Sequence, residues 1–284
     1  MSCYNETMTT IRAIERHALN MRRNIVRMLV TAGSGHPAGS LGLADIFAAL
    51  YFDVLHYNPK NPVDPERDIL VLSAGHVVPV QYAALAEAGL IPEKELLTLR
   101  KFGSRLQGHP ERDKMPWCET TSGPLGEGIS QAAGMAYALQ NWQESKRRRH
   151  IYCVTGDGEL DEGQNWEAMM FAAKYDLSNL TVIVDRNNIQ IDGTTEDVMP
   201  LEPLPDKWQS FGWHVIQIDG NNVESFIDAC AMARAVTDRP SVIIAYTVPG
   251  KGVDFMENDH KWHGEAPSPE QAKKALAQLE ADSI

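Results

Sequence analysis

The feature that most constrains the fold is the alternation of short apolar runs with helical patterns in the second half of the chain. Runs of β-type residues occupy 151–155, 180–185, 213–218 and 241–247, and helical patterns occupy the regions near 166–175, 223–236 and 269–279. Strands joined by helix-length connections pair in parallel, with their helices on the two faces of the sheet. The sequence therefore predicts an α/β fold with a doubly wound, mostly parallel sheet.

The first half of the chain fits the same architecture. Helical patterns span 7–30, 41–55, 80–88 and 126–144, a strand is predicted at 69–72, and a glycine-rich break covers 33–37. No internal repeat, low-complexity tract or linker divides the 284 residues. We therefore expect one domain over residues 1–284.

Charge and composition exclude several classes of protein. The formal net charge of −12 argues against nucleic acid or an anionic membrane as the main partner, and the basic run at 146–149 is interpreted as a solvated helix C-terminus. The apolar stretch 41–52 is interrupted by Asp45 and is shorter than the roughly 18 residues of a membrane span. Cys3, Cys118, Cys153 and Cys230 form no CxxC pair, and no secretory signal is evident, so a reduced, cytoplasmic protein is expected.

One predicted strand ends in Gly156-Asp157-Gly158, where an open α/β sheet binds its ligands. The two glycines allow a ligand to approach the backbone, and the N-terminus of the following helix favours an anion. A carboxylate beside a diphosphate is repulsive unless a cation lies between them, so Asp157 is predicted to hold a hard divalent ion. A dinucleotide-binding glycine motif does not fit, because Asp161 occupies its third glycine position.

The next predicted strand ends in a second polar segment. Asn187 lies 30 positions after Asp157 and can supply a side-chain oxygen to the same ion, and the turn that follows frees a main-chain carbonyl, for which we take that of Ile189. Either segment alone is more often a simple turn without a ligand. Together, on consecutive parallel strands, they favour a metal–diphosphate site with Mg²⁺, or with Ca²⁺ or Mn²⁺ in its place.

The spacing of this Gly-Asp-Gly segment and Asn187 resembles the thiamine diphosphate fingerprint. Five further motifs resemble, in order, the histidine and glycine motifs of transketolases: Ser34-Gly35-His36-Pro37, Gly75-His76, Gly108-His109-Pro110-Glu111, Gly123-Pro124-Leu125-Gly126 and His260-Lys261-Trp262-His263-Gly264. The resemblance extends from about His36 to His263. It implies the diphosphate-binding domain of that family.

The resemblance, taken with the strand-end segments, implies a role for each residue. The metal ion is expected on Asp157, Asn187 and the Ile189 carbonyl. The cofactor is expected on His76, Gly123, Pro124, Leu125, Gly156, Gly158, Glu159, Asn187 and His263. The sugar is expected on His36, His109 and His263, with His36 and His263 as catalytic groups that assist proton transfer.

The histidines also support this interpretation by their setting. His36, His76 and His109 each follow a glycine in a predicted loop, and imidazole exchanges protons near neutral pH. A sugar hydroxyl buried without a hydrogen bond costs about 1–3 kcal/mol, so a sugar site needs such partners. The spacing of His260 and His263 also suggests zinc, but no third ligand is evident nearby.

Transketolases of one chain continue into a pyrimidine-binding domain, whose glutamate activates the cofactor, and a C-terminal domain. This sequence ends at Ile284, so the resemblance implies that those domains lie on a partner chain, in an α2β2 heterotetramer. The implied function is that of the N-terminal subunit of a transketolase, a transferase of the pentose phosphate pathway. It would transfer a two-carbon ketol group reversibly from a ketose phosphate to an aldose. The partner is expected to meet the segments flanking 126–128 and the helix around 162–175.

Three alternatives remain at this stage. The alpha chain of a 2-oxo acid dehydrogenase is also split, deoxyxylulose phosphate synthase is a long single chain, and a non-catalytic module would bind the cofactor without ketol transfer. Decarboxylation of a 2-oxo acid does not require several Gly-His loops. His36, His76 and His109 together therefore favour a sugar substrate.

Overall fold

The computed structural model describes residues 11–142 and 147–281, and one parallel sheet forms its centre. The strands are β1 Ile69–Leu72, β2 Ile151–Gly156, β3 Leu180–Arg186, β6 His214–Asp219 and β7 Ser241–Tyr246, in the spatial order β1-β2-β3-β7-β6. Every neighbouring pair in this sheet is parallel. A small antiparallel hairpin, β4 Ile189–Gln190 and β5 Gly193–Thr194, follows β3 directly.

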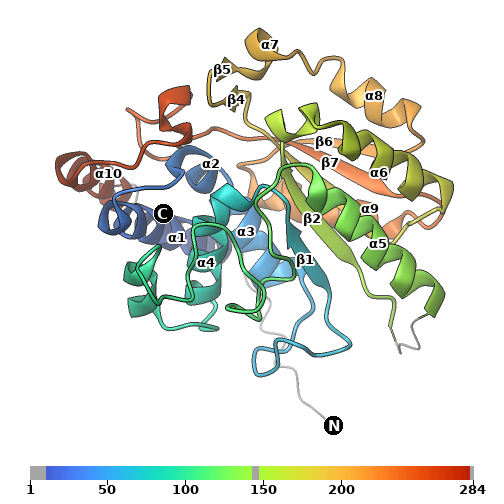
Figure 1. The fold of residues 1–284 in the computed structure, drawn as a ribbon, viewed down its shortest axis with the longest axis horizontal. Helices are drawn as coiled ribbons and strands as arrows, with labels where there is room; N and C mark the ends of the chain where they lie inside the picture. The colour runs from blue at the N-terminus through green and yellow to red at the C-terminus, as the bar shows by residue number, and fades with distance from the viewer. Residues whose placement is uncertain (1–10, 143–146, 282–284) are drawn as a thin grey trace.

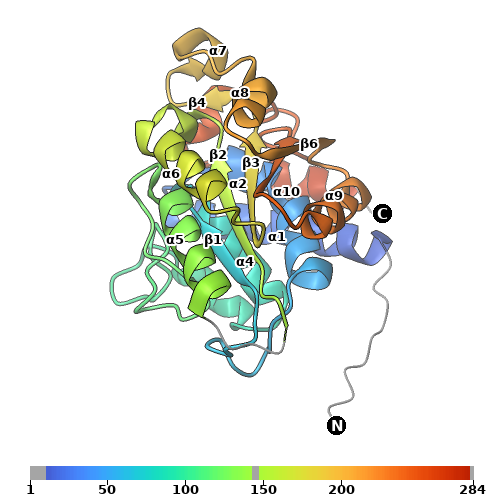
Figure 2. The ribbon, with the colours of Figure 1, turned by 90° about the vertical axis from the view of Figure 1, so that its right-hand side faces the viewer.

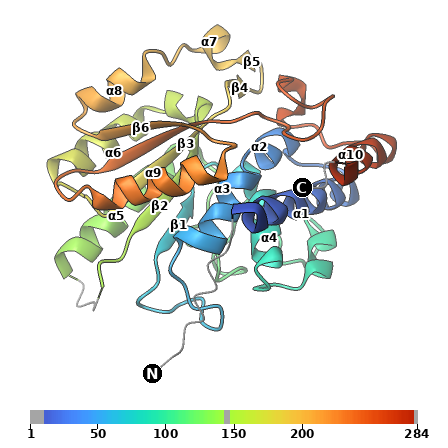
Figure 3. The same ribbon diagram turned by 180° about the vertical axis from the view of Figure 1, so that it is seen from behind.

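Helices cover both faces of the sheet. They are α1 Ile11–Ala32, α2 Pro37–Gly42, α3 Ala44–Ala49, α4 Val78–Glu87, α5 Glu127–Trp142, α6 Gly163–Lys174, α7 Thr195–Val198, α8 Leu204–Ser210, α9 Val223–Ala235 and α10 Pro269–Ala281. Figure 1 shows α5 and α6 in front of the sheet, and Figure 3 shows α1, α3 and α9 on the opposite side. The predicted doubly wound α/β fold is confirmed.

Two hydrophobic cores explain why the strands are continuous apolar runs in the sequence. In β2, Tyr152 and Val154 point into the core beneath α1, α3, α4 and α9, whereas Ile151 and Cys153 point into the core beneath α5, α6 and α8. All four side chains are fully buried. Side chains of a strand alternate between faces, so a strand covered on both faces needs apolar residues at every position.

Several predicted boundaries differ from those observed. The predicted helix over 41–55 is instead three pieces, because α2 already begins at Pro37, α3 follows it, and Leu50–Val54 forms a π-helical turn. Proline suits the first turn of a helix, where its missing N–H has no partner to lose. The ends predicted at residues 7–10 and 143–144 lie outside the described residues.

The short elements after β3 were not predicted from the sequence. The β4–β5 hairpin, α7 and α8 are each too short to show a periodic apolar pattern. Figures 1, 2 and 3 all show the hairpin and α7 at one end of the molecule, the end at which β3 leaves the sheet. This placement brings the hairpin to the site described below.

The interpretation of the basic run as a helix C-terminus is wrong for the residues that the structure describes. Residues 147–149 are not helical and lead into β2, and Lys146 lies outside the described residues. Arg147 pairs with Asp68 at 2.9 Å, and Arg148 donates to Ser178 at 2.6 Å, so these cations have protein partners.

Two further expectations concern cysteines and membranes. The cysteines at 118, 153 and 230 are free and buried, and Cys3 lies outside the described residues. Within residues 11–142 and 147–281, no helix is both long enough and apolar enough to cross a bilayer.

Candidate active site

Asp157 lies at the carboxyl end of β2, where the chain leaves the sheet. The residue is 1% exposed, and its carboxylate accepts hydrogen bonds from Gly158 N at 2.8 Å, Asn188 N at 2.6 Å and Arg186 Nη1 at 3.1 Å. Burial raises the pKa of Asp157 to about 6, against the opposing effect of these hydrogen bonds and of the Arg186 charge. The carboxylate is thus fixed in orientation before any ligand binds.

Asn187 follows β3 and is held by a second buried acid. Its Nδ2 donates to Asp185 Oδ2 at 2.8 Å, and Thr247 Oγ1 donates to the other oxygen of Asp185. Burial raises the pKa of Asp185 to about 7. Asn188 has a φ of 61°, which confirms the irregular turn predicted here. The side-chain amide of Asn187 is thereby held in place, and it lines the same cavity as Asp157.

The glycines of the Gly-Asp-Gly segment differ in what they require. A Cβ on Gly158 would lie 3.3 Å from Gln190 Cβ, so the hairpin packs closely against this residue. A Cβ on Gly156 would be in ordinary van der Waals contact with Glu159 and Ala74, so the space around it does not require glycine. The helix predicted to follow is interrupted: a short 3-10 helix, Gly158–Asp161, precedes α6.

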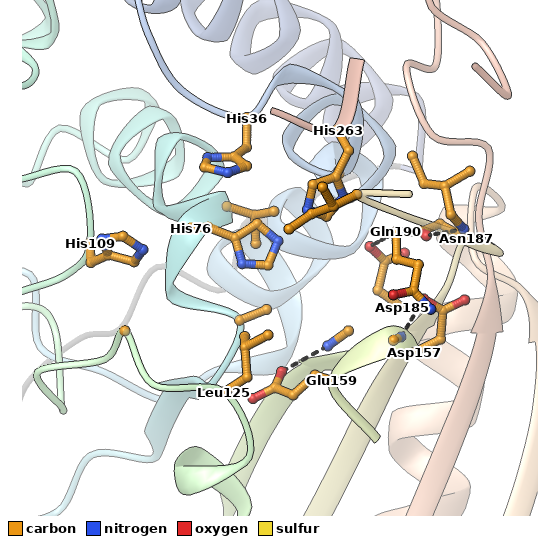
Figure 4. Close-up of a pocket in the computed structure, with 18 residues that line it drawn as sticks. His36, His76, His109, Leu125, Asp157, Glu159, Asp185, Asn187, Gln190 and His263 are labelled. Atoms are coloured by element: carbon orange, nitrogen blue, oxygen red, sulfur yellow. Dashed lines mark hydrogen bonds between the residues drawn. The ribbon is translucent and has the colours of Figure 1, made fainter. Parts of the chain in front are cut away.

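Three histidines from distant segments form a cluster facing the same space (Figure 4). The ring centroids of His36 and His76 are 4.9 Å apart, those of His76 and His263 5.1 Å, and those of His36 and His263 5.5 Å. His36 precedes α2, His76 lies in the 3-10 helix Gly75–Val77, and His263 ends the 3-10 helix His260–His263. The three segments therefore bring the rings together, but His76 and His263 lie in 3-10 turns and not in the irregular loops that the sequence predicts.

Burial keeps these imidazoles neutral near pH 7. It lowers the pKa of His36 to about 4, with further lowering from His263 and Arg100, and it lowers the pKa of His76 and of His263 as well. A neutral imidazole offers one donor and one acceptor. The Nδ1 of His36 is buried without a hydrogen-bond partner among the described residues, which leaves one polar atom for a ligand.

Asp157, Asp185 and Asn187, at the carboxyl ends of β2 and β3, form what we call the acid edge. One cavity of about 350 Å³ joins this acid edge to the histidine cluster. Of the residues predicted for the site, those lining it are His36, His76, His109, Gly123, Leu125, Gly156, Asp157, Gly158, Glu159, Asn187, Ile189 and His263. Pro124 does not line it. The remaining lining residues, which sequence reasoning missed, are Gly39, Ala74, Val77, Asp185, Gln190 and Ile191.

Two of the missed residues left a signal in the sequence. Asp185 is the polar end of an apolar strand and stands two residues before Asn187. Gly39 follows the Gly-His motif, and a Cβ there would lie 2.8 Å from a methyl group of Val77. Gln190 and Ile191 enter through the hairpin and could not be placed without it.

Comparison with known proteins identifies the family. The sequence model described as "Transketolase, thiamine diphosphate binding domain" matches residues 14–282. The chain belongs to the transketolase family. It therefore carries that family's thiamine diphosphate-binding domain.

The relatives include both separate subunits and long chains. The 6-deoxy-6-sulfo-D-fructose transketolase subunit SqwG of Clostridium sp. (strain MSTE9) is 42% identical over 269 residues, which is 93% of this chain and 97% of that protein. An apulose-4-phosphate transketolase subunit of Actinobacillus succinogenes is 40% identical, covering 94% of this chain and 95% of that protein. Human transketolase is 39% identical over 94% of this chain, which spans 42% of that protein.

Solved transketolases share the fold. The transketolase of Leishmania mexicana superposes with a TM-score of 0.88 at 34% identity, over 94% of this chain and 41% of the other. That of Campylobacter jejuni gives 0.88 at 36% identity, over 95% and 43%. The matched family supports the transketolase interpretation over a 2-oxo acid dehydrogenase alpha chain or a non-catalytic module.

Proposed function

We propose that the chain is the cofactor-diphosphate-binding subunit of a two-chain transketolase. The enzyme would transfer a two-carbon ketol group reversibly between a ketose phosphate and an aldose, a reaction type of the pentose phosphate pathway. The observation that carries the proposal is a single cavity that joins a buried acid–amide edge to a cluster of neutral histidines.

The donors at the acid edge fit a Mg²⁺ ion that arrives with a diphosphate. In the described parts of the chain, no group of three or more His, Cys, Asp or Glu side chains can hold a metal ion. Asp157, Asn187 Oδ1 and the Ile189 carbonyl supply oxygens only, which suits a hard cation that takes its remaining ligands from phosphate and water. A zinc site on His260 and His263 has no support either, because no third such ligand joins them among the described residues.

The cofactor's own share of the reaction is carbanion chemistry, for which the chain supplies placement and proton transfer. His76, Gly123, Leu125 and Gly158 would border the bound cofactor. His36 and His263 are poised to accept or return a proton, because their lowered pKa leaves an imidazole nitrogen free at pH 7. His109 would bind the donor's hydroxyls.

A partner chain with the pyrimidine domain would complete the enzyme, in a cytoplasmic α2β2 assembly in which this chain is one domain. Two findings support this proposal. The chain spans nearly the whole of relatives named as subunits and 42% of human transketolase. In addition, α5 and α6 pack side by side, and large apolar side chains on and beside them are exposed: Leu125, Trp142, Met170, Phe171 and Tyr175.

The test is reconstitution. The purified chain alone should bind thiamine diphosphate weakly and show no ketol transfer. Activity should appear when a chain with the pyrimidine domain is added, and it should saturate near equal stoichiometry. Turnover by this chain alone, at a purity that excludes host transketolase, would overturn the two-chain proposal.

Matched variants locate the metal and the partner within that assay. Asp157→Ala should weaken Mg²⁺-dependent cofactor binding by at least about tenfold, whereas the exposed Asp161→Ala should not. Phe171→Asp on α6 should weaken partner binding, whereas Met232→Asp on α9, which is also exposed, should leave it intact. Equal effects within either pair would show that the site or the face is wrongly placed.

A further inference from the structure

The carboxylate of Glu159 lies at the cavity wall (Figure 4), and four donors from the chain itself saturate it. One oxygen accepts from Ser73 Oγ at 2.5 Å and Gly126 N at 2.7 Å, and the other accepts from Thr155 Oγ1 at 2.7 Å and Gly156 N at 3.1 Å. An ionised carboxylate has about four acceptor positions. Glu159, which is 3% exposed, therefore has none left for a ligand.

The four donors belong to three segments that border the cavity: residues 73–74 after β1, of which Ala74 lines it, the glycine loop 123–126 and the end of β2. Ser73 extends the network, because its Oγ also accepts from Gly128 N in the first turn of α5 at 3.1 Å. A Cβ on Gly128 would lie 2.3 Å from Ser73 Cβ, so only glycine allows this approach. Through Ser73, the carboxylate holds the start of α5 against the sheet.

We propose that Glu159 is a positioning residue, which fixes the glycine loop relative to Asp157 so that both can border one bound cofactor. It acts through its contacts and does not touch the ligand. The inference rests on the proposed function, because it takes the cavity as the thiamine diphosphate site.

A second tether to the same loop is weaker. Gln164 Nε2 donates to Leu125 O at 3.0 Å, at an exposed position. Hydrogen bonds to an ionised group are roughly twice as strong as neutral ones, and burial removes competition from water. Glu159 should therefore dominate the placement of the loop.

Glu159→Gln tests this with the shape unchanged. The amide nitrogen replaces one oxygen and then faces one backbone N–H and one hydroxyl. The hydroxyl can turn to accept from the amide, but the backbone N–H cannot, so this buried donor loses its partner. In the reconstituted two-chain enzyme, the Mg²⁺–thiamine diphosphate concentration for half-maximal activity should rise at least about tenfold. Turnover at saturating cofactor should change less than about threefold, because no reacting group is altered.

Ser73→Ala is the milder second variant if the first folds poorly. It removes one donor and should raise the same cofactor concentration by about threefold, with a less than additive effect in the double variant. Gln164→Ala should shift it less than either. An equal or larger shift from Gln164→Ala would overturn the ranking of the two tethers.

Asp68→Asn is the control for a purely structural role. Asp68 is a buried carboxylate that accepts from His56 N, His150 N, Arg147 and Arg234 just before β1, at the other end of the sheet. The Asp68→Asn substitution should lower the thermal stability of the chain and leave its affinity for the cofactor unchanged. If Glu159→Gln behaves in the same way, the positioning role fails. If the wild-type enzyme binds no thiamine diphosphate, the proposed function fails instead.

Discussion

Arg186 is the residue whose replacement should most clearly reveal how the acid edge is held together. Its guanidinium donates to Asp157 at 3.1 Å, Thr195 Oγ1 at 2.6 Å, Glu196 at 2.7 Å and Glu202 at 3.0 Å. It thus joins the predicted metal ligand to the segment that follows the β4–β5 hairpin. Arg186→Met keeps the apolar stem and removes every one of these bonds.

The expected loss of folding stability comes mainly from the buried pair. The side chains of Arg186 and Asp157 are 5% and 2% exposed, and removing one partner of such a pair costs about 3–5 kcal/mol. Glu196 and Glu202 are 36% and 45% exposed, so each adds less than about 1 kcal/mol. Protonation of Asp157 limits the loss through this pair to about 1.4 kcal/mol at pH 7, since the pKa in the folded wild type is already about 6 and each unit between that pKa and the pH is worth about 1.4 kcal/mol.

Thermal and urea unfolding of the chain without cofactor measure this loss. The contributions together give a loss of about 2–3 kcal/mol, which corresponds to a fall in Tm of roughly 4–12 °C for a domain of this size. The deficit should shrink as the pH falls from 7 to about 6, because the folded variant already carries a proton on Asp157 there, whereas the folded wild type takes it up only as the pH approaches its pKa of about 6. Arg239→Met, at the exposed pair with Asp238, should change nothing measurable. A Tm for Arg186→Met within about 2 °C of that control would refute the reasoning.

Two further predictions concern the histidines. His36→Ala and His109→Ala should raise the Michaelis constant for the sugar or lower turnover, while cofactor binding is spared. His263→Ala should damage both sugar turnover and cofactor binding. Unchanged kinetics of His109→Ala on every ketose phosphate tested would exclude a role of His109 in binding the donor sugar. Burial lowers the pKa of His150 from 6.5 to about 3, so below pH 6.5 the unfolded chain binds a proton that the folded chain does not. The free energy of unfolding should therefore fall by about 1.4 kcal/mol per pH unit as the pH drops from 6.5. His150→Gln should flatten this slope in urea titrations at several pH values by about one proton, and an unchanged slope would contradict the assignment.

The parts of the fold that sequence reasoning recovered are those with a local signature. β1 was predicted at its observed bounds, because a four-residue apolar run followed by Ser73 and glycine has few other interpretations. The three Gly-His segments place His36, His76 and His109 on one cavity, although His76 lies in a 3-10 turn and not in an irregular loop. Such features depend on residues adjacent in the chain.

The parts that were missed depend on residues distant in the chain. Arg186 stands beside Asn187 in the sequence, but only the return of the chain after the hairpin shows that its guanidinium reaches Glu196 and Glu202 as well as Asp157. Glu159 was assigned to the cofactor because it follows the Gly-Asp-Gly segment, whereas Ser73 lies 86 positions away from it. No periodicity or spacing encodes contacts of this kind.

The electrostatics of the cavity explain why a cofactor with a diphosphate would need a divalent ion here. Asp157 is paired with Arg186, Glu159 is surrounded by donors, and burial raises the pKa of Asp185 to about 7. The histidine cluster is neutral near pH 7, because burial lowers the pKa of His36 to about 4 and that of His76 well below its usual value. The described cavity therefore offers an anion little positive charge of its own, and charge compensation must come mainly from the cation that the anion brings.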